Sequence, residues 1–351
     1  MIIHQNFLGG NISLKGREGN RIFLENELRD TEGDWFYWAF CVENAEVGTF
    51  VFEMQKHRVG YYGPAVSTDL RHWHWLGELD GDSFTYTFAG GETVYFAHHM
   101  LYHPSRLESF VGDKGLEISE FCKSRKGRSV PCLRMGEGDI SILLTARHHA
   151  CESTGNYVLE GILSELCESP IADARILAVP FVDYDGVLDG DQGKSRRPHD
   201  HNRDYTDAPI YPEVAAILAY AEENGCNYAF DFHSPWHIGG ENDWIFAVRN
   251  MSEKVEKNER FSAILEAEMT ADSMRYTAAN DHPPCTGWNQ PGPNFSRTMN
   301  LRNECDLAFT LESTYFGKAD NIVSAERLVA LGRCFARAMK KYIKERNGLR
   351  S

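Results

Sequence analysis

An apolar run that ends in two histidines constrains this chain more than any other feature. Residues Ile140–Leu144 have the composition of a buried strand, and Arg147-His148-His149-Ala150-Cys151-Glu152 follow where a helical pattern begins. An imidazole and a carboxylate three residues apart at such a junction can bind one zinc ion, with a third ligand from elsewhere and an open position for water. The pattern alone is a weak signal, because the helix dipole also favours Glu in a solvated first turn. The rest of the chain has to supply the other parts of a site.

Three downstream segments offer such parts. His233 closes the apolar run Tyr228–Phe230 and is expected at the carboxyl end of a buried strand, where α/β proteins keep their sites. Glu312 ends the apolar run Ala308–Leu311, where an unpaired carboxylate would be costly as packing but useful as a general base beside a zinc-bound water. Upstream of both, Asp200-His201-Asn202-Arg203 provides a guanidinium that can hold a carboxylate with two hydrogen bonds.

This set of motifs resembles the zinc carboxypeptidases of the M14 type, over about Gly127 to Phe316. The family's H-x-x-E and D-x-H motifs match this chain, although His-Ala-Cys-Glu replaces the common H-P-G-E form. The resemblance implies one zinc ion per chain, a general base in T-x-E context, a D-x-N-R segment that binds the substrate's terminal carboxylate, and an aspartate that orients a ligand imidazole. On this chain these roles fall on His149, Glu152 and His233 for zinc, Glu312 for the base, Asn202 and Arg203 for the carboxylate, and Asp200 for orientation.

Two choices remain within these motifs. Only His149 stands three residues before Glu152, so His148 is expected to have no ligand role. The family also needs a cation that stabilises the oxyanion formed at the scissile carbonyl. The glycine-containing loop Gly190–Arg197 offers Lys194, Arg196 and Arg197, and we select Arg196. The alternative for each of the three is a solvent-facing charge.

Length and composition limit the remaining possibilities. A chain of 351 residues favours two domains. The amino terminus lacks the pattern of a signal peptide, no run approaches the ~20 apolar residues of a membrane span, and nine cysteines without a C-x-x-C pair fit a reducing compartment, so a cytoplasmic location is expected. The formal charge of −15 argues against nucleic acid and anionic membranes as partners.

The two halves of the chain have different patterns. Aromatic and β-branched segments separated by Gly, Asp and Asn turns predict an all-β antiparallel sandwich at residues 1–115; they include Trp35–Val42, Gly48–Met54, Phe84–Phe88 and Val94–Phe96. Residues 116–351 alternate strand and helix patterns, which predicts an α/β domain whose mixed sheet is flanked by helices. The expected strands are Ile140–Ala146, Ile176–Val182, Tyr228–His233, Trp244–Val248 and Leu307–Leu311, and the expected helices are Ser153–Leu166, Pro212–Glu223 and Ala325–Arg346.

A β-sandwich before an M14 domain narrows the resemblance to the cytosolic carboxypeptidases. In that subfamily an arginine about fifteen residues before the general base is implied to face the substrate's last side chain, and here this is Arg297. The resemblance thus implies a metallocarboxypeptidase that removes a C-terminal Glu or Asp from peptide or protein tails. Two alternatives stay open: a zinc-dependent deacylase of N-acyl amino acids, similar to aspartoacylase, and an inactive relative that binds acidic tails.

Overall fold

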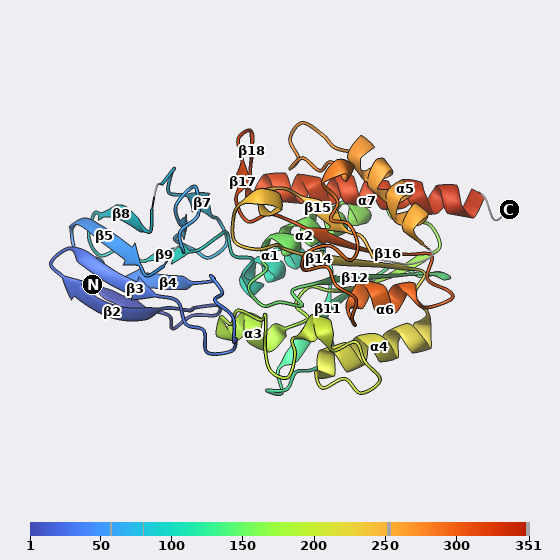
Figure 1. Cartoon of the computed structure of the whole chain (residues 1–351), viewed down its shortest axis with the longest axis horizontal. Coiled ribbons are helices and arrows are strands. Elements are labelled where there is room, and N and C mark those ends of the chain that lie inside the picture. Colours follow the sequence, from blue (N-terminus) through green and yellow to red (C-terminus); the bar gives the residue numbers. More distant parts are fainter. Residues whose placement is uncertain (57, 80, 251–253, 349–351) are drawn as a thin grey trace.

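Two structural regions follow one another along the chain. The computed structural model describes residues 1–56, 58–79, 81–250 and 254–348. In Figure 1 the amino-terminal strands form one body at the left, and the larger α/β body with the carboxyl-terminal helix lies at the right. Among the described helices, none is long and apolar enough to cross a membrane. The predicted division of the chain at residues 115 and 116 stays a prediction.

The amino-terminal body consists of two sheets packed face to face. One has the strand order β1-β4-β9-β6-β7 and the other β2-β3-β5-β8. Most pairs are antiparallel as predicted, but β3 and β5 are parallel. The strands are β1 (Ile2–His4), β2 (Ser13–Glu18), β3 (Arg21–Glu25), β4 (Ala39–Glu43), β5 (Gly48–Met54), β6 (Ala65–Ser67), β7 (His74–Trp75), β8 (Ser83–Phe88) and β9 (Val94–Ala97).

An aromatic core holds these two sheets together. Along β5 the alternate residues Phe50, Phe52 and Met54 are buried, which is the two-residue period of a strand with one covered face. They pack against Phe96 of the other sheet and against Trp38, which directly precedes β4. The aromatic run at 35–42 forms a strand only from Ala39 onward, and the residues before it lead toward the α/β body.

The larger body contains a seven-stranded mixed sheet with the order β10-β11-β13-β12-β14-β16-β15. Its central strands β13, β12, β14 and β16 are parallel. The pairings at the edges are antiparallel, between β10 and β11, between β11 and β13, and between β15 and β16. The strands are β10 (Ile118–Lys123), β11 (Ser129–Met135), β12 (Ile140–Ala146), β13 (Ala174–Val179), β14 (Tyr228–His233), β15 (Phe246–Val248) and β16 (Leu307–Glu312), and a separate hairpin pairs β17 (Gly317–Lys318) with β18 (Asn321–Ile322).

Helices cover both faces of this sheet, as the alternation predicts. Helices α2, α5 and α7 pack on one face with Ile142 and Leu144, while α4 and α6 pack on the other with Leu143. The helices are α1 (Pro104–Lys114), α2 (Thr154–Glu168), α3 (Tyr184–Asp189), α4 (Pro212–Asn224), α5 (Val255–Ala267), α6 (Phe295–Asn300) and α7 (Ala325–Gly348), with short 3₁₀ helices η1 (His201–Arg203), η2 (Gly240–Asp243) and η3 (Ala278–Asn280). The parallel strands β12, β14 and β16 end at the same edge, and the site lies there.

Candidate metal site and active-site cleft

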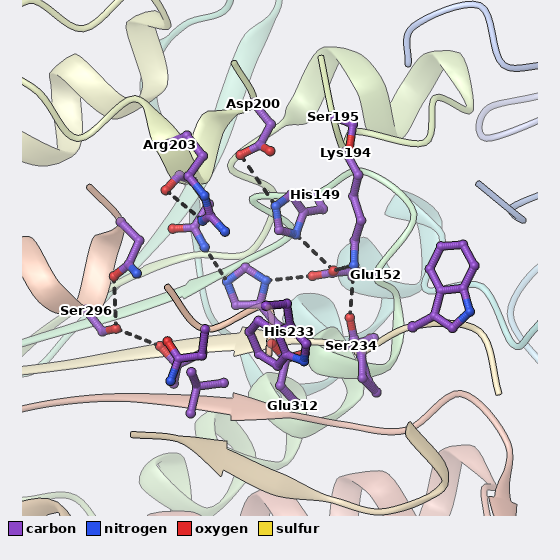
Figure 2. A pocket seen from close by; sticks show the side chains of 18 of the residues that line it. His149, Glu152, Lys194, Ser195, Asp200, Arg203, His233, Ser234, Ser296 and Glu312 are labelled. Carbon is purple, nitrogen blue, oxygen red and sulfur yellow. Dashed lines mark hydrogen bonds and ion pairs between the residues drawn. The ribbon is translucent and has the colours of Figure 1, made fainter. Parts of the chain in front are cut away.

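Three side chains from two neighbouring strand ends form a potential metal site. His149 and Glu152 follow β12, and His233 is the last residue of β14. Nδ1 of His149 lies 2.9 Å from Oε1 of Glu152, and Nδ1 of His233 lies 2.7 Å from Oε2 of the same carboxylate. All the potential ligand atoms lie within 4.8 Å of one another. Figure 2 shows the two imidazoles facing the Glu152 carboxylate, a donor set that suits zinc.

A carboxylate also lies behind each imidazole. Nε2 of His149 is 3.5 Å from Oδ1 of Asp200, and Nε2 of His233 is 2.6 Å from Oδ2 of Asp231. Metal-binding histidines usually have such a partner, which fixes the ring orientation and leaves the other nitrogen for the metal. The sequence analysis did not assign Asp231, although Asp-x-His in a strand places both side chains on one face.

His148 belongs to the same network but does not face the cleft. Its Nδ1 lies 2.9 Å from Asp231 and its Nε2 lies 2.6 Å from the hydroxyl of Tyr205. His148, Asp231 and His233 are also close enough to hold a metal, but His148 is fully buried. The group formed by His149, Glu152 and His233 lines a cleft of about 450 Å³ and is therefore the one that a substrate could reach.

Glu312 supplies a second carboxylate to this cleft. It is the last residue of β16 and pairs in register with His233 of β14. The side chain is buried, and within the described ranges its Oε2 has no hydrogen-bond partner. Burial raises the pKa of Glu312 to about 7, and the nearby Glu152 carboxylate acts in the same direction. A buried carboxyl group with an open oxygen beside a metal site has the properties of a general base.

The η1 segment brings the predicted carboxylate anchors to the same cleft. The Asn202 amide nitrogen lies 3.5 Å from Nε2 of His233, and its oxygen accepts a hydrogen bond from the backbone of Phe295. Arg203 also lines the cleft. Its guanidinium donates to the carbonyl of Asn202 at 3.4 Å, and no carboxylate of the described residues lies within ion-pair distance of it. A cation in this state can bind an anionic ligand.

The structure places Lys194, rather than Arg196, in the cleft. The Lys194 ammonium forms an ion pair with Glu152 and lies 3.4 Å from the carbonyl oxygen of Ser234. Although burial lowers it, the pKa of Lys194 is raised overall by Glu152, so the ammonium is charged. Arg196 lines a different cavity, where its guanidinium is held by Asp30, Asp183 and Asp191 at 2.7–3.0 Å. The choice of Arg196 as the oxyanion cation is therefore corrected, because three carboxylates already saturate it.

Arg297 reaches the cleft wall but also supports a loop. Its guanidinium donates to the carbonyls of Gln290 and Gly292 and, at 2.7 Å, to the side-chain oxygen of Asn289. Arginine has five N–H donors, so this arrangement leaves donors for a further acceptor. Burial lowers the pKa of Arg297, and the neighbouring Arg203 acts in the same direction. The two guanidinium groups thus lie near enough to reinforce each other's attraction for an anion.

Comparison with known proteins agrees with this geometry. No protein-family profile matches the chain. An uncharacterised protein of Zymomonas mobilis is 28% identical over 66% of the chain and 67% of its own length. Cytosolic carboxypeptidase 2 of Macaca fascicularis is 24% identical over 69% of the chain, and cytosolic carboxypeptidase 3 of Mus musculus is 27% identical over 44%. The chain spans only 32% and 18% of these two longer relatives.

Solved structures share the whole architecture, including the amino-terminal sandwich. A metallo-carboxypeptidase from Pseudomonas aeruginosa, in complex with (2-guanidinoethylmercapto)succinic acid, has a TM-score of 0.80 at 21% identity and covers 98% of this chain and 100% of its own. A metallo-carboxypeptidase from Burkholderia cenocepacia has a TM-score of 0.76 at 19% identity and covers 98% and 99%. The chain thus has the fold of these metallo-carboxypeptidases and is similar in sequence to the cytosolic carboxypeptidases.

In this carboxypeptidase-like fold, the sandwich contributes to the cleft in a way that sequence reasoning missed. Trp35, which precedes β4, lines the cleft together with residues of the α/β body. Lys194 reaches the cleft because Gly193, with φ of +77°, packs against the backbone at Ala150, where an added Cβ would lie 2.1 Å from a nitrogen atom. The Gly-Lys pair in the loop was the available signal for Lys194, whereas nothing in the sequence indicated Trp35.

Proposed function

We propose that this protein is a zinc-dependent carboxypeptidase that removes the C-terminal residue of peptides or proteins. The observation that carries this proposal is the meeting of the His149–Glu152–His233 group with Glu312 in one cleft. The donor set is the two-histidine, one-glutamate set of catalytic zinc sites, and the carboxylates behind both imidazoles support one zinc ion per chain. Zinc there would polarise the scissile carbonyl and lower the pKa of the attacking water.

The chain's own side chains divide the remaining work. Glu312 accepts the proton of the attacking water and returns it to the leaving amine. Lys194 donates to the developing oxyanion, a role that its charge and its place beside Glu152 support. Arg203 holds the substrate's terminal carboxylate with Asn202, and the absence of an ion-pair partner for Arg203 among the described residues supports this. Asp200 orients His149.

The preferred substrate ends in an acidic residue. Arg297 and Arg203 line the same cleft, and each lowers the free-energy cost of bringing negative charge there. A terminal Glu or Asp carries two carboxylates, which matches two guanidinium groups. The remaining donors of Arg297 pair with the side-chain carboxylate. The partners are therefore acidic peptide or protein tails, and not nucleic acid or anionic membranes, since the chain carries a formal charge of −15.

A cytoplasmic location fits this activity. The two carboxypeptidase relatives named above carry the word cytosolic in their names, and the nine cysteines, all within the described ranges, form no disulfide bond, as expected in a reducing compartment.

The decisive experiment uses zinc-reconstituted protein and matched peptides. We expect bound zinc near one ion per chain, and loss of one residue from a peptide ending in free Glu but not from its C-terminal amide, followed by mass spectrometry. His149→Ala should lose most of the zinc, because a Glu–His pair alone holds the ion weakly. Zinc content well below one per chain, internal cleavage, or release of acetate from N-acetyl-aspartate without peptide trimming would contradict the proposal.

A further inference from the structure

The cleft continues beyond the metal-binding group toward the amino-terminal sandwich. In Figure 2 this group lies between Arg203 on one side and Lys194 with Ser234 on the other. If Arg203 holds the terminal carboxylate, the chain that precedes the scissile bond must leave past Lys194 and Ser234. The side chains at this exit are Trp35, from the sandwich, and Trp236, two residues after Ser234. This step rests on the proposed carboxypeptidase function.

The two indoles form one aromatic corner with Lys194. Their ring centroids are 4.9 Å apart in an edge-to-face arrangement. The Lys194 ammonium lies 4.9 Å from the centroid of Trp35, which is a cation–π contact. Trp35 is partly buried, whereas Trp236 leaves 41% of its surface exposed. Trp35 therefore supports the corner from behind, and Trp236 offers apolar surface to a ligand.

The sandwich holds the loop that carries Trp236. Phe36 contacts the rings of Trp236 and His237 with centroids 5.2 Å away in both cases. Nε2 of His98, just after β9, lies 2.7 Å from Nδ1 of His237. The hydroxyl of Tyr61 donates to Asp243 at 3.1 Å, at the far end of the same loop. A surface held at several points is pre-organised, and binding to it costs little ordering entropy.

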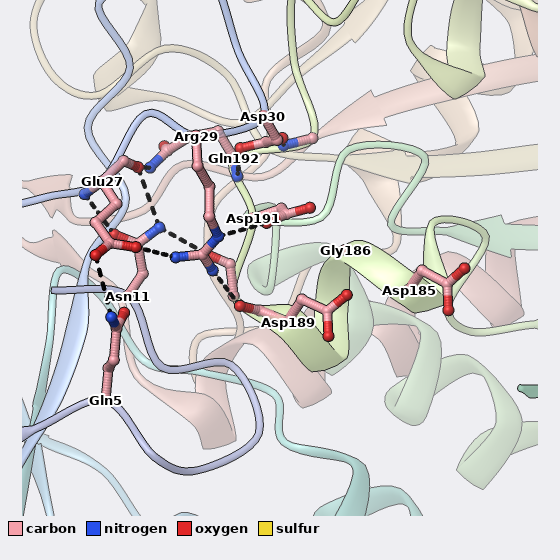
Figure 3. Close-up of polar contacts among 12 residues, drawn as sticks. Gln5, Asn11, Glu27, Arg29, Asp30, Asp185, Gly186, Asp189, Asp191 and Gln192 are labelled. Carbon is pink, nitrogen blue, oxygen red and sulfur yellow. Dashed lines mark hydrogen bonds and ion pairs between the residues drawn. The ribbon is translucent and has the colours of Figure 1, made fainter. Parts of the chain in front are cut away.

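The sandwich also fixes the segment that leads to Lys194. Figure 3 shows the residues of this contact. Asp30 accepts hydrogen bonds from the backbone nitrogens of Gln192 at 3.0 Å and Gly193 at 2.8 Å. The side chain of Gln192 donates to the carbonyl of Glu27 at 3.1 Å, and Asn11 donates to the carbonyl of Gly190 at 2.7 Å. The sandwich thus determines the position of both parts of the corner.

We propose that Trp35 and Trp236 form a subsite for the residue that precedes the scissile bond, and that this subsite selects an apolar or aromatic side chain. In this arrangement the sandwich is part of the substrate-binding site and not only an attached domain. Trp236 contacts the substrate, and Trp35 is a positioning residue that holds Trp236 and Lys194. An exposed indole at the mouth of a cleft stacks well on an aromatic side chain and covers an aliphatic one.

The test uses zinc-reconstituted full-length protein and peptides of the form acetyl-Ala-Ala-X-Glu, with X as Phe, Leu, Ala or Gly. Wild type should show kcat/KM for Phe and Leu about tenfold or more above that for Gly. Trp236→Ala should remove this difference, and Trp236→Phe should restore part of it. Gly33→Ala should reduce it without touching the substrate, because a Cβ at Gly33 would lie 2.3 Å from Nε1 of Trp35.

Trp244→Ala is the matched control, since Trp244 is 38% exposed and lies outside the cleft lining. Equal rates for all four peptides in wild type, an unchanged ranking in Trp236→Ala, or loss of the ranking in Trp244→Ala would overturn the subsite. The dissociation constants of the same peptides, read from tryptophan fluorescence of Glu312→Gln, separate the two proposals. If the four peptides differ in affinity but wild type cleaves none of them, the subsite is supported and the peptidase is rejected. If wild type cleaves all four equally and they bind equally, the peptidase is supported and the subsite is rejected.

Discussion

Two arginines on one loop have opposite surroundings. Arg196, at the junction with the sandwich, is surrounded by three carboxylates at 2.7–3.0 Å. Arg203, at the end of the same loop, faces the cleft, and no carboxylate of the described residues pairs with it. The saturated, largely buried Arg196 stabilises a particular arrangement, whereas the guanidinium of Arg203 is exposed and solvated and can exchange water for an anionic ligand. The role of a charged residue therefore depends on which residues surround it, and not on its residue type alone.

Glu312 gives the largest expected effect, because it is the open carboxyl group of the cleft. Glu312→Gln keeps the size of the side chain but cannot accept a proton, so kcat should fall by about 10²–10⁴-fold. Zinc content and melting temperature should stay close to those of wild type. In wild type, kcat/KM should decrease as the pH falls through the pKa of Glu312, since only the carboxylate acts as a base, and a bound zinc ion should move this limb below 7. Retained turnover in the variant would mean that another group is the base.

Lys194 tests the corrected choice of the oxyanion cation. Lys194→Met keeps the length of the side chain and removes the charge, so kcat should fall about 10²–10³-fold, the usual cost of losing one oxyanion donor. The affinity for an uncleaved peptide with the same C-terminus should change far less. Steady-state kinetics and fluorescence titration measure the two quantities. Equal losses in kcat and affinity would instead assign Lys194 to substrate binding.

Arg297 should have a smaller and more selective effect. If it pairs with an acidic terminal side chain, Arg297→Ala should lower kcat/KM for peptides ending in Glu by about one to two orders of magnitude, because a charge-assisted hydrogen bond is worth roughly 1.5–3 kcal/mol. Peptides ending in Leu should be less affected. Arg302→Ala is a suitable control, since Arg302 pairs with Glu222 and Glu304. The acidic preference fails if Arg297→Ala keeps the wild-type ranking of terminal residues.

The sequence was sufficient to predict the fold class and the main elements, because their patterns are local. The period of the apolar residues placed β12, β14 and β16 within a residue of their observed bounds. Parallel strands end at the same edge of a sheet, so the alignment of His149, His233 and Glu312 follows from that order alone. Strand positions and motif spacing were therefore enough to predict the carboxypeptidase-like fold, which the structure confirms.

The contacts of individual charges could not be predicted from the sequence. Lys194 and Arg196 are two residues apart in a loop, and only the tertiary structure decides which enters the cleft. Arg196 turns away because Asp30 arrives from the sandwich, far away in the sequence. Trp35 likewise comes from the sandwich and reaches the cleft only in the tertiary structure. Such long-range pairings leave no periodic pattern in the chain, and residue spacing cannot reveal them.

The most direct test of this account compares Arg203→Ala with Arg196→Ala in one series, measuring melting temperature, zinc content and kcat/KM on a peptide ending in Glu. We expect Arg203→Ala to keep its melting temperature and zinc and to lose about two orders of magnitude in kcat/KM. Arg196→Ala should lose about 3 kcal/mol of stability, because three carboxylates lose their partner, while its folded fraction keeps more activity than Arg203→Ala. An Arg196→Ala protein that is fully stable but inactive, or an active Arg203→Ala protein, would contradict the account.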